Sequence, residues 1–241
     1  MQLSNIKAMK KQLVVSLFLL GYVVFSANVF AQEATTFSAK DIKKLYLSGY
    51  FKVELVKGNE EKVVFNAPED VKRLIKVKSA KNEIVIRGKS KKLKRISRRR
   101  VHIRIYYKQL EAIKARNGVY VMGKEPIENK DFSLVVIEGS QVDLRMNTKD
   151  LKARVSMGSE ALLEGTTDTF QVKVKMGSSL EAYSFKTNIC YVNTGMGSDA
   201  SVFAREAIYM SAGMGSSIKY RGSPKKVLKS NAWMGSDINR N

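Results

Sequence analysis

Positive charge is densest between residues 89 and 104, and this basic segment is the clearest candidate for chemistry in the 241-residue chain. The segment contains no acidic residue, and arginine forks match the geometry of sulfate, phosphate and carboxylate groups. It therefore predicts a contact for polyanions; the alternative interpretation is a solvated hairpin loop between two strands. The candidate polyanion-binding residues are Lys91, Lys92, Lys94, Arg95, Arg98, Arg99, Arg100 and Arg104.

The charge of the whole chain supports the same class of partner. The formal net charge is +21, from 43 basic and 22 acidic residues. A field this positive favours polyanions, and for an exported protein we expect acidic glycans or lipopolysaccharide. Nucleic acid is not expected as a partner, because aromatic residues do not interleave the basic segment as single-strand binding requires.

Residues suited to catalysis or to binding hard metal ions are sparse. His102 is the only histidine, so a histidine-based metal site or a pair of histidines is excluded. The acids within the repeats fall at different offsets from the repeat glycine, which predicts neither a calcium ladder nor a carboxylate pair for glycoside hydrolysis. These acids are Asp143, Glu160, Glu181, Asp199 and Asp237. We expect no catalytic residue, no metal and no cofactor.

Methionine recurs at five positions, and each copy is followed by glycine and serine. The five are Met157, Met176, Met196, Met214 and Met234. A ladder of thioethers suits copper or another soft metal. The methionine nevertheless shares the strand parity of the apolar columns, and its flexible side chain fills irregular space inside a corner. Core packing is therefore the preferred interpretation, and the serines are expected to bond backbone at the turn.

These residues must be positioned by a repeat, because glycine returns every 18 to 21 residues from Gly118 to Gly235. Residues seven before, three before and three after each glycine are mostly apolar, as the inward face of a strand requires. The interval is too short for a strand-helix-strand unit. The sequence predicts an all-β fold, a right-handed parallel β-helix (solenoid) with coils of about 20 residues.

The corners of this solenoid are assigned to the repeat glycines. A corner that needs a positive φ, or a close approach of two backbones, is made at least cost by glycine. The structural repeat corners are Gly139, Gly158, Gly177, Gly197, Gly215 and Gly235.

Residues 32–110 show looser strand alternation than the repeats that follow. Strands are expected over 50–56, 62–65, 75–77, 84–86 and 101–107, and a short helix over 68–74 is the only credible one. This N-terminal β region should cap or continue the solenoid, because an open coil end exposes unpaired edge groups. The predicted boundaries are residues 1–31 for a signal peptide, 32–110 for the N-terminal β region and 111–241 for the solenoid.

The first 31 residues have the pattern of a secretory signal peptide. Three lysines precede an apolar run over 13–25, and Ala31 ends a small-residue cleavage site. The run is shorter than a membrane span needs, so no transmembrane segment is expected after signal removal. The protein is predicted to be exported, to the periplasm or to the cell surface. Its only cysteine, Cys190, is expected to be buried, and no internal disulfide can form.

The N-terminal segments resemble a known family. Residues 45–55 (LYLSGYFKVEL), 61–70 (EKVVFNAPED) and 83–86 (EIVI), followed by glycine-serine corners, are similar to the putative auto-transporter adhesin, head GIN domain family of exported bacterial proteins. The resemblance covers residues from roughly 40 onward, and it implies a right-handed β-helix from a Bacteroidetes-type envelope. This chain departs from the pattern by repeating methionine where members carry small residues. The resemblance implies no ligand residues.

Three functional hypotheses follow. The first is a noncatalytic exported adhesin-like binding or structural protein that contacts acidic glycans or other envelope polyanions through a basic patch. The second is a polysaccharide-degrading β-helix enzyme, which lacks acids close to the basic residues in sequence. The third is an envelope assembly module that self-associates through the solenoid ends, because the final coil has no capping helix after it.

The basic segment generates the first testable prediction. Replacing Arg98, Arg99 and Arg100 together with serine should weaken binding to heparin, because three guanidinium groups leave the segment, while circular dichroism shows an unchanged fold. Binding is measured as a function of salt, since exposed charges are screened. An affinity for heparin equal to that of the parent protein would show that these arginines do not contribute to binding.

Overall fold

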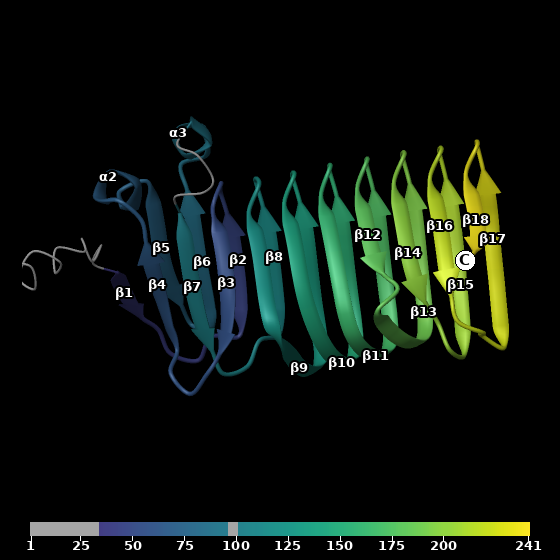
Figure 1. The fold of residues 1–241 in the computed structure, drawn as a ribbon, viewed down its shortest axis with the longest axis horizontal. Helices are drawn as coiled ribbons and strands as arrows, with labels where there is room; N and C mark the ends of the chain where they lie inside the picture. Colours follow the sequence, from purple (N-terminus) through teal and green to yellow (C-terminus); the bar gives the residue numbers. More distant parts are fainter. Residues whose placement is uncertain (1–33, 96–100) are drawn as a thin grey trace, which may run out of the picture. The chain divides into compact units, whose positions relative to one another are not determined.

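The computed structural model describes residues 34–95 and 101–241, and Ala34–Asn241 form one compact unit. The strands stack side by side along the long axis of the molecule (Figure 1). They form a β-solenoid with parallel pairing from coil to coil, which confirms the predicted fold class. The predicted signal peptide, residues 1–31, lies outside the described residues.

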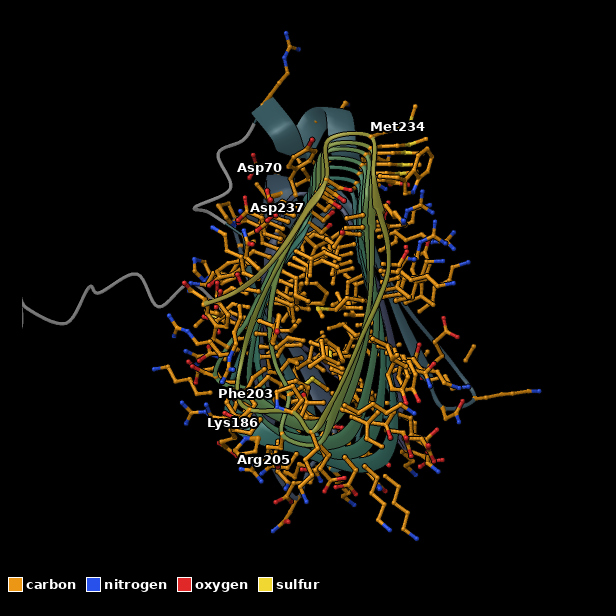
Figure 2. All side chains as sticks on the ribbon, turned by 90° about the vertical axis from the view of Figure 1, so that its right-hand side faces the viewer. Asp70, Lys186, Phe203, Arg205, Met234 and Asp237 are labelled. Atoms are coloured by element: carbon orange, nitrogen blue, oxygen red, sulfur yellow. The ribbon has the colours of Figure 1, made fainter. Side chains whose placement is uncertain are left out.

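The solenoid is flattened into two layers, which Figure 2 shows end-on. Layer A contains β1 (Thr35–Ser38), β4 (Lys62–Asn66), β7 (His102–Tyr107), β3 (Lys52–Lys57), the first parts of β9 (Tyr120–Ile137), β10 (Gln141–Ser156) and β11 (Glu160–Lys175), and then β12 (Ser179–Ala182), β14 (Asp199–Phe203), β16 (Ser217–Arg221) and β18 (Asp237–Arg240). Layer B contains β5 (Ile75–Ala80), β6 (Glu83–Gly88), β2 (Lys44–Ser48), β8 (Ala112–Arg116), the second parts of β9, β10 and β11, and then β13 (Phe185–Gly195), β15 (Ala207–Gly213) and β17 (Lys226–Trp233). Each coil therefore contributes one strand to each layer.

The core lies between the layers and is built from the predicted inward columns. The column three residues after the repeat glycine is buried in every coil, in the order Val142, Ala161, Leu180, Ala200, Ile218 and Ile238. Cys190 is also buried, and burial raises the pKa of its thiol. Leu228, seven residues before Gly235, is an exception to the predicted inward columns. A register shift between β15 and β17 aligns it with the outward Tyr209 and leaves it 46% exposed.

The methionines are not in the core, so the prediction of core packing is wrong. Their side chains are 42% to 67% exposed, and Met234 is the most exposed of the five. In each coil the methionine and the glycine both have positive φ, for example 57° at Met176 and 63° at Gly177. Two consecutive left-handed residues reverse the chain, as in a type I′ turn. The strand alternation ends at this turn, and the methionine therefore points outward.

Several serines after the glycines bond turn backbone as predicted, namely Ser198, Ser216 and Ser236, whereas the Ser140 hydroxyl has no partner among the described residues. Those at Ser140, Ser159, Ser178, Ser198 and Ser216 are fully or almost fully buried beneath the turn. The hydroxyl of Ser198 lies 2.7 Å from the carbonyl oxygen of Val174 and 2.9 Å from that of Gly195, and it accepts a hydrogen bond from the Gly195 amide. This hydroxyl therefore links Gly195 of its own turn to Val174 of the preceding coil, and its polar atom is satisfied although it is buried.

The N-terminal β region both continues and caps the solenoid. Strands β2 and β3 pair in parallel with β8 and β9, so coil-to-coil pairing crosses the proposed boundary at residue 110, which stays a prediction. Antiparallel pairs β1–β4, β4–β7 and β5–β6 cover the end. The predicted short helix is present as α2 (Glu69–Lys72), preceded by Pro68.

A second helix, α3 (Ser90–Arg95), lies within the basic segment, where the sequence suggested a hairpin loop. Its one apolar residue, Leu93, is completely buried. The Leu93 Cδ1 atom lies against Gly88, so close that a Cβ at position 88 would meet it at 2.3 Å. The sequence did not indicate this buried contact, because Leu93 is the only apolar residue among the neighbouring lysines and arginines.

The turn geometry predicts the effect of Gly177→Ala. A Cβ at Gly177 would have nothing within 4 Å, but φ is +63°, so the cost comes from backbone conformation alone. We expect a loss of about 1–2 kcal/mol in the free energy of unfolding, measured by denaturant titration. The control is Gly58→Ala, which also adds a methyl group to open space but lacks a positive φ. Equal stabilities for the two variants would contradict this account of the corner.

The buried serines provide a second matched pair. Ser198→Ala removes a hydroxyl with three hydrogen-bond contacts and should reduce the free energy of unfolding by about 1–3 kcal/mol. Ser140→Ala removes an equally buried hydroxyl that has no partner among the described residues. It should leave stability unchanged or slightly raised. A larger loss for Ser140→Ala than for Ser198→Ala would overturn the role of the serine ladder.

Candidate polyanion-binding face

The described candidate residues of the basic segment lie on two different elements. Lys92 and Arg95 are exposed on α3, and Lys91 and Lys94 belong to the same helix. Arg104 lies on β7 in layer A, where its Nε donates to Glu54 Oε2 at 2.8 Å. This hydrogen bond raises the pKa of Arg104 and balances its charge. Arg98, Arg99 and Arg100 lie outside the described residues.

A larger basic surface, which the sequence analysis missed, covers the outer side of layer B. We call it the basic face, and its side chains are exposed or half-buried. It consists of Lys44, Lys76, Lys78, Arg87, Lys114, Arg116, Lys152, Arg154, Lys173 and Lys175. Strand register assembles it, since Arg154 pairs directly with Lys173 and β2 brings Lys44 beside β6 and β8. The signal available in the sequence was the column four residues before the repeat glycine, where Arg154 and Lys173 both fall.

The positive charges on this face are close enough to affect one another. Lys175 extends over Gly195 of the next coil, and its Nζ donates to the Thr194 carbonyl oxygen at 3.0 Å. Burial and then repulsion from Lys173 lower the pKa of Lys175. An anion bound here would relieve part of this repulsion.

Tyr46 forms the centre of the N-terminal part of the basic face. The Arg87 guanidinium lies 5.3 Å from the centre of its ring, and the Lys114 Nζ lies 5.4 Å away. Arg116 donates to the Tyr46 hydroxyl at 3.1 Å and forms two hydrogen bonds with the Glu138 carboxylate. The Arg116 guanidinium is thereby held in place, while Arg87 and Lys114 lie over the ring as cations.

The C-terminal part of the basic face carries a pair of stacked tyrosines. The rings of Tyr191 on β13 and Tyr209 on β15 lie 4.5 Å apart at an angle of 10°. Lys226 lies 5.7 Å from the centre of the Tyr209 ring. The stack borders a hollow of about 660 Å³, whose polar lining includes Lys152, Gln171, Lys173, Asn193 and Ser211. An apolar ring surface beside a few polar groups is typical of sites that orient a small ring-shaped ligand.

Layer A has a different chemical character. Its outer side mixes both charges, with Asp143, Glu160, Glu164, Glu181 and Asp199 among its carboxylates. Some of these are paired, as Glu164 is with Arg145 at 2.9 Å. Across residues 34–95 and 101–241, no three His, Cys, Asp or Glu side chains come together as a metal site. The two layers therefore separate a mixed face from a basic one.

The family follows from comparison with known proteins. The family model described as putative auto-transporter adhesin, head GIN domain, matches residues 41–224. The chain belongs to this family. The match confirms the resemblance that residues 45–86 suggested and includes most of the basic face. No curated protein matches the sequence.

Solved structures share the fold of this head GIN domain chain. A putative adhesin of Bacteroides fragilis superposes with a TM-score of 0.79 at 18% identity, covering 87% of this chain and 96% of that one. A putative lipid binding protein of Parabacteroides distasonis gives 0.62 at 13% identity, and a putative adhesin of Parabacteroides merdae gives 0.57 at 8%. Those two cover 87% of this chain and 96% and 95% of their own.

The described helices of the head GIN domain chain, α2 and α3, are short. None in the part of the chain that the structure describes has the length and apolar character needed to cross a membrane.

Proposed function

We propose that this head GIN domain protein is a noncatalytic, exported, adhesin-like protein that binds acidic glycans through the basic face of layer B. The observation that carries the proposal is the charge of the outer side of layer B, where lysine and arginine outnumber carboxylates, whereas the outer side of layer A mixes both signs. Its site of action is the periplasm or the cell surface. The family description supports an adhesin-like role.

Two features favour a glycan over other polyanions. A flat, rigid face on which cations of neighbouring strands lie about 4.8 Å apart, as Arg154 and Lys173 do, suits an extended polymer with repeated acidic groups. The stacked Tyr191 and Tyr209 and the hollow beside them add an apolar surface with amide and hydroxyl groups, which a polymer of bare charges would not use. The enzyme hypothesis draws no comparable support, because the basic face carries few carboxylates, and one of them, Glu138, is hydrogen-bonded to Arg116.

Self-association remains the second candidate, and one observation favours it. The final coil exposes the apolar side chains of Val227, Leu228 and Trp233, each at least 40% accessible. At the other end, antiparallel strands already cover the solenoid. Association through the final coil would give an oligomer that persists at high salt, whereas binding through the basic face is weakened by salt.

The test of glycan binding uses residues 32–241 on immobilised heparin and on an array of acidic and neutral glycans. The variant Lys152→Ser/Arg154→Ser/Lys173→Ser should bind heparin about tenfold less tightly, with each exposed ion pair contributing about 0.5 kcal/mol. The control Lys124→Ser/Lys130→Ser/Lys149→Ser removes the same charge from exposed positions at the bends between the layers. Equal losses in the two variants would mean that only net charge matters and would defeat the proposal.

A tyrosine variant separates a glycan site from a general anion site. Tyr191→Ala/Tyr209→Ala keeps every charge of the basic face, so binding to sugar-free polyphosphate should be unchanged. Binding to the preferred acidic glycan should fall severalfold, because the stacked rings are removed. If polyphosphate and glycan binding fall together, or neither falls, the tyrosine stack has no role in recognition.

A further inference from the structure

The exposed methionines form a continuous ladder along the narrow edge of the solenoid. Figure 2 looks along the stack from the C-terminal end and shows Met234 projecting from the turn, with further sulfur-bearing side chains behind it. Backbone hydrogen bonds of 2.9 Å fix the rungs, since the glycine amide of each turn donates to the methionine carbonyl oxygen of the next, as Gly177 does to Met196. The methionine ladder consists of Met157, Met176, Met196, Met214 and Met234.

The turn itself does not call for methionine. All five have φ between 52° and 60°, a conformation that costs a residue with a side chain about 1–2 kcal/mol and that asparagine and glycine tolerate best. The two preceding turns place Asn117 and Glu138 at the equivalent position. Exposure of 42% to 67% also reduces the packing advantage of a long apolar side chain. Five repeated costs without a folding benefit indicate a function for the side chains.

The property that the five side chains share is a thioether sulfur. Thioethers are soft ligands that select Cu(I) over harder ions. An ion between two sulfurs, with bonds of about 2.3 Å like those between zinc and cysteine, needs them about 4.6 Å apart. Neighbouring rungs repeat at the strand spacing of about 4.8 Å, and the three rotatable bonds of methionine allow the remaining adjustment.

An aromatic ring lies at the C-terminal end of the ladder. The Trp233 indole covers Gly213, where a Cβ would meet its Nε1 at 2.6 Å. Trp233 precedes Met234, and Gly213 precedes Met214, so the ring lies beside these two rungs. Aromatic faces attract cations, and the ring therefore favours a cation bound at the Met214–Met234 pair.

We infer that the methionine ladder is a binding site for soft monovalent metal ions of the Cu(I) class, held between sulfurs of successive coils. The site is separate from the basic face and does not depend on glycan binding. The only thiol of the chain, that of Cys190, is completely buried, and burial raises its pKa. It is therefore not available to an ion at the surface.

The experiment titrates Ag⁺, a soft monovalent probe that needs no reductant, into residues 32–241 carrying Cys190→Ala, in chloride-free buffer. Trp233 is the only tryptophan of the chain, so its fluorescence reports on the Met214–Met234 pair. We expect saturable quenching, matched by heat release in calorimetry. The variant Met196→Leu/Met214→Leu/Met234→Leu should bind at least tenfold less tightly and lose the quenching.

Two further proteins make the result decisive. Met122→Leu/Met146→Leu removes two thioethers elsewhere and should bind Ag⁺ like the parent. Asparagine at positions 196, 214 and 234 suits a positive φ, so it preserves the turn if leucine disturbs folding, and it too should lose binding. Absence of saturable Ag⁺ binding, or unchanged affinity in both the leucine and asparagine variants, would overturn the inference.

Discussion

Parallel, in-register hydrogen bonding between successive coils is the constraint on which the rest of this structure depends. Successive coils stack one strand spacing apart, so residues at equivalent positions in the repeat must form columns along the solenoid. The two-residue left-handed turn connects the two layers without interrupting the hydrogen bonding between coils, since the amide of the turn glycine donates to the next coil. Inside the turn, the buried Ser198 hydroxyl bonds Gly195 of its own turn and Val174 of the preceding coil.

The same stacking of coils brings outward-facing residues of similar type together into surfaces. A side chain in one coil becomes part of a larger surface when the neighbouring coil carries a similar one, as Arg154 and Lys173 do on layer B. Columns that point inward produce a core of almost constant cross-section. Columns that point outward produce a basic face, a mixed face and a sulfur-bearing edge. The flat solenoid therefore presents chemically distinct surfaces on a single rigid frame.

The two ends of the frame differ for a physical reason. At the N-terminal end, antiparallel strands β1, β4 and β5 cover the first coils, and Leu93 of α3 is buried. At the C-terminal end, β17 is paired only with β15 among the described strands, and its residues Val227 and Trp233 are exposed. Edges of this kind favour pairing with another strand, which gives self-association a structural basis distinct from the charged faces.

The sequence by itself determined the repeat, the parallel solenoid, the inward columns such as Val142 and Ile218, and the buried serines, because alternation and period are local properties. Only the tertiary structure decided that the methionines are exposed, since that depends on the positive φ of two consecutive residues and not on alternation. The tertiary structure also decided which cationic side chains lie on the same face. Lys44, Arg87 and Lys114 come from coils of unequal length, and strand register, which the sequence does not state, brings them onto one face.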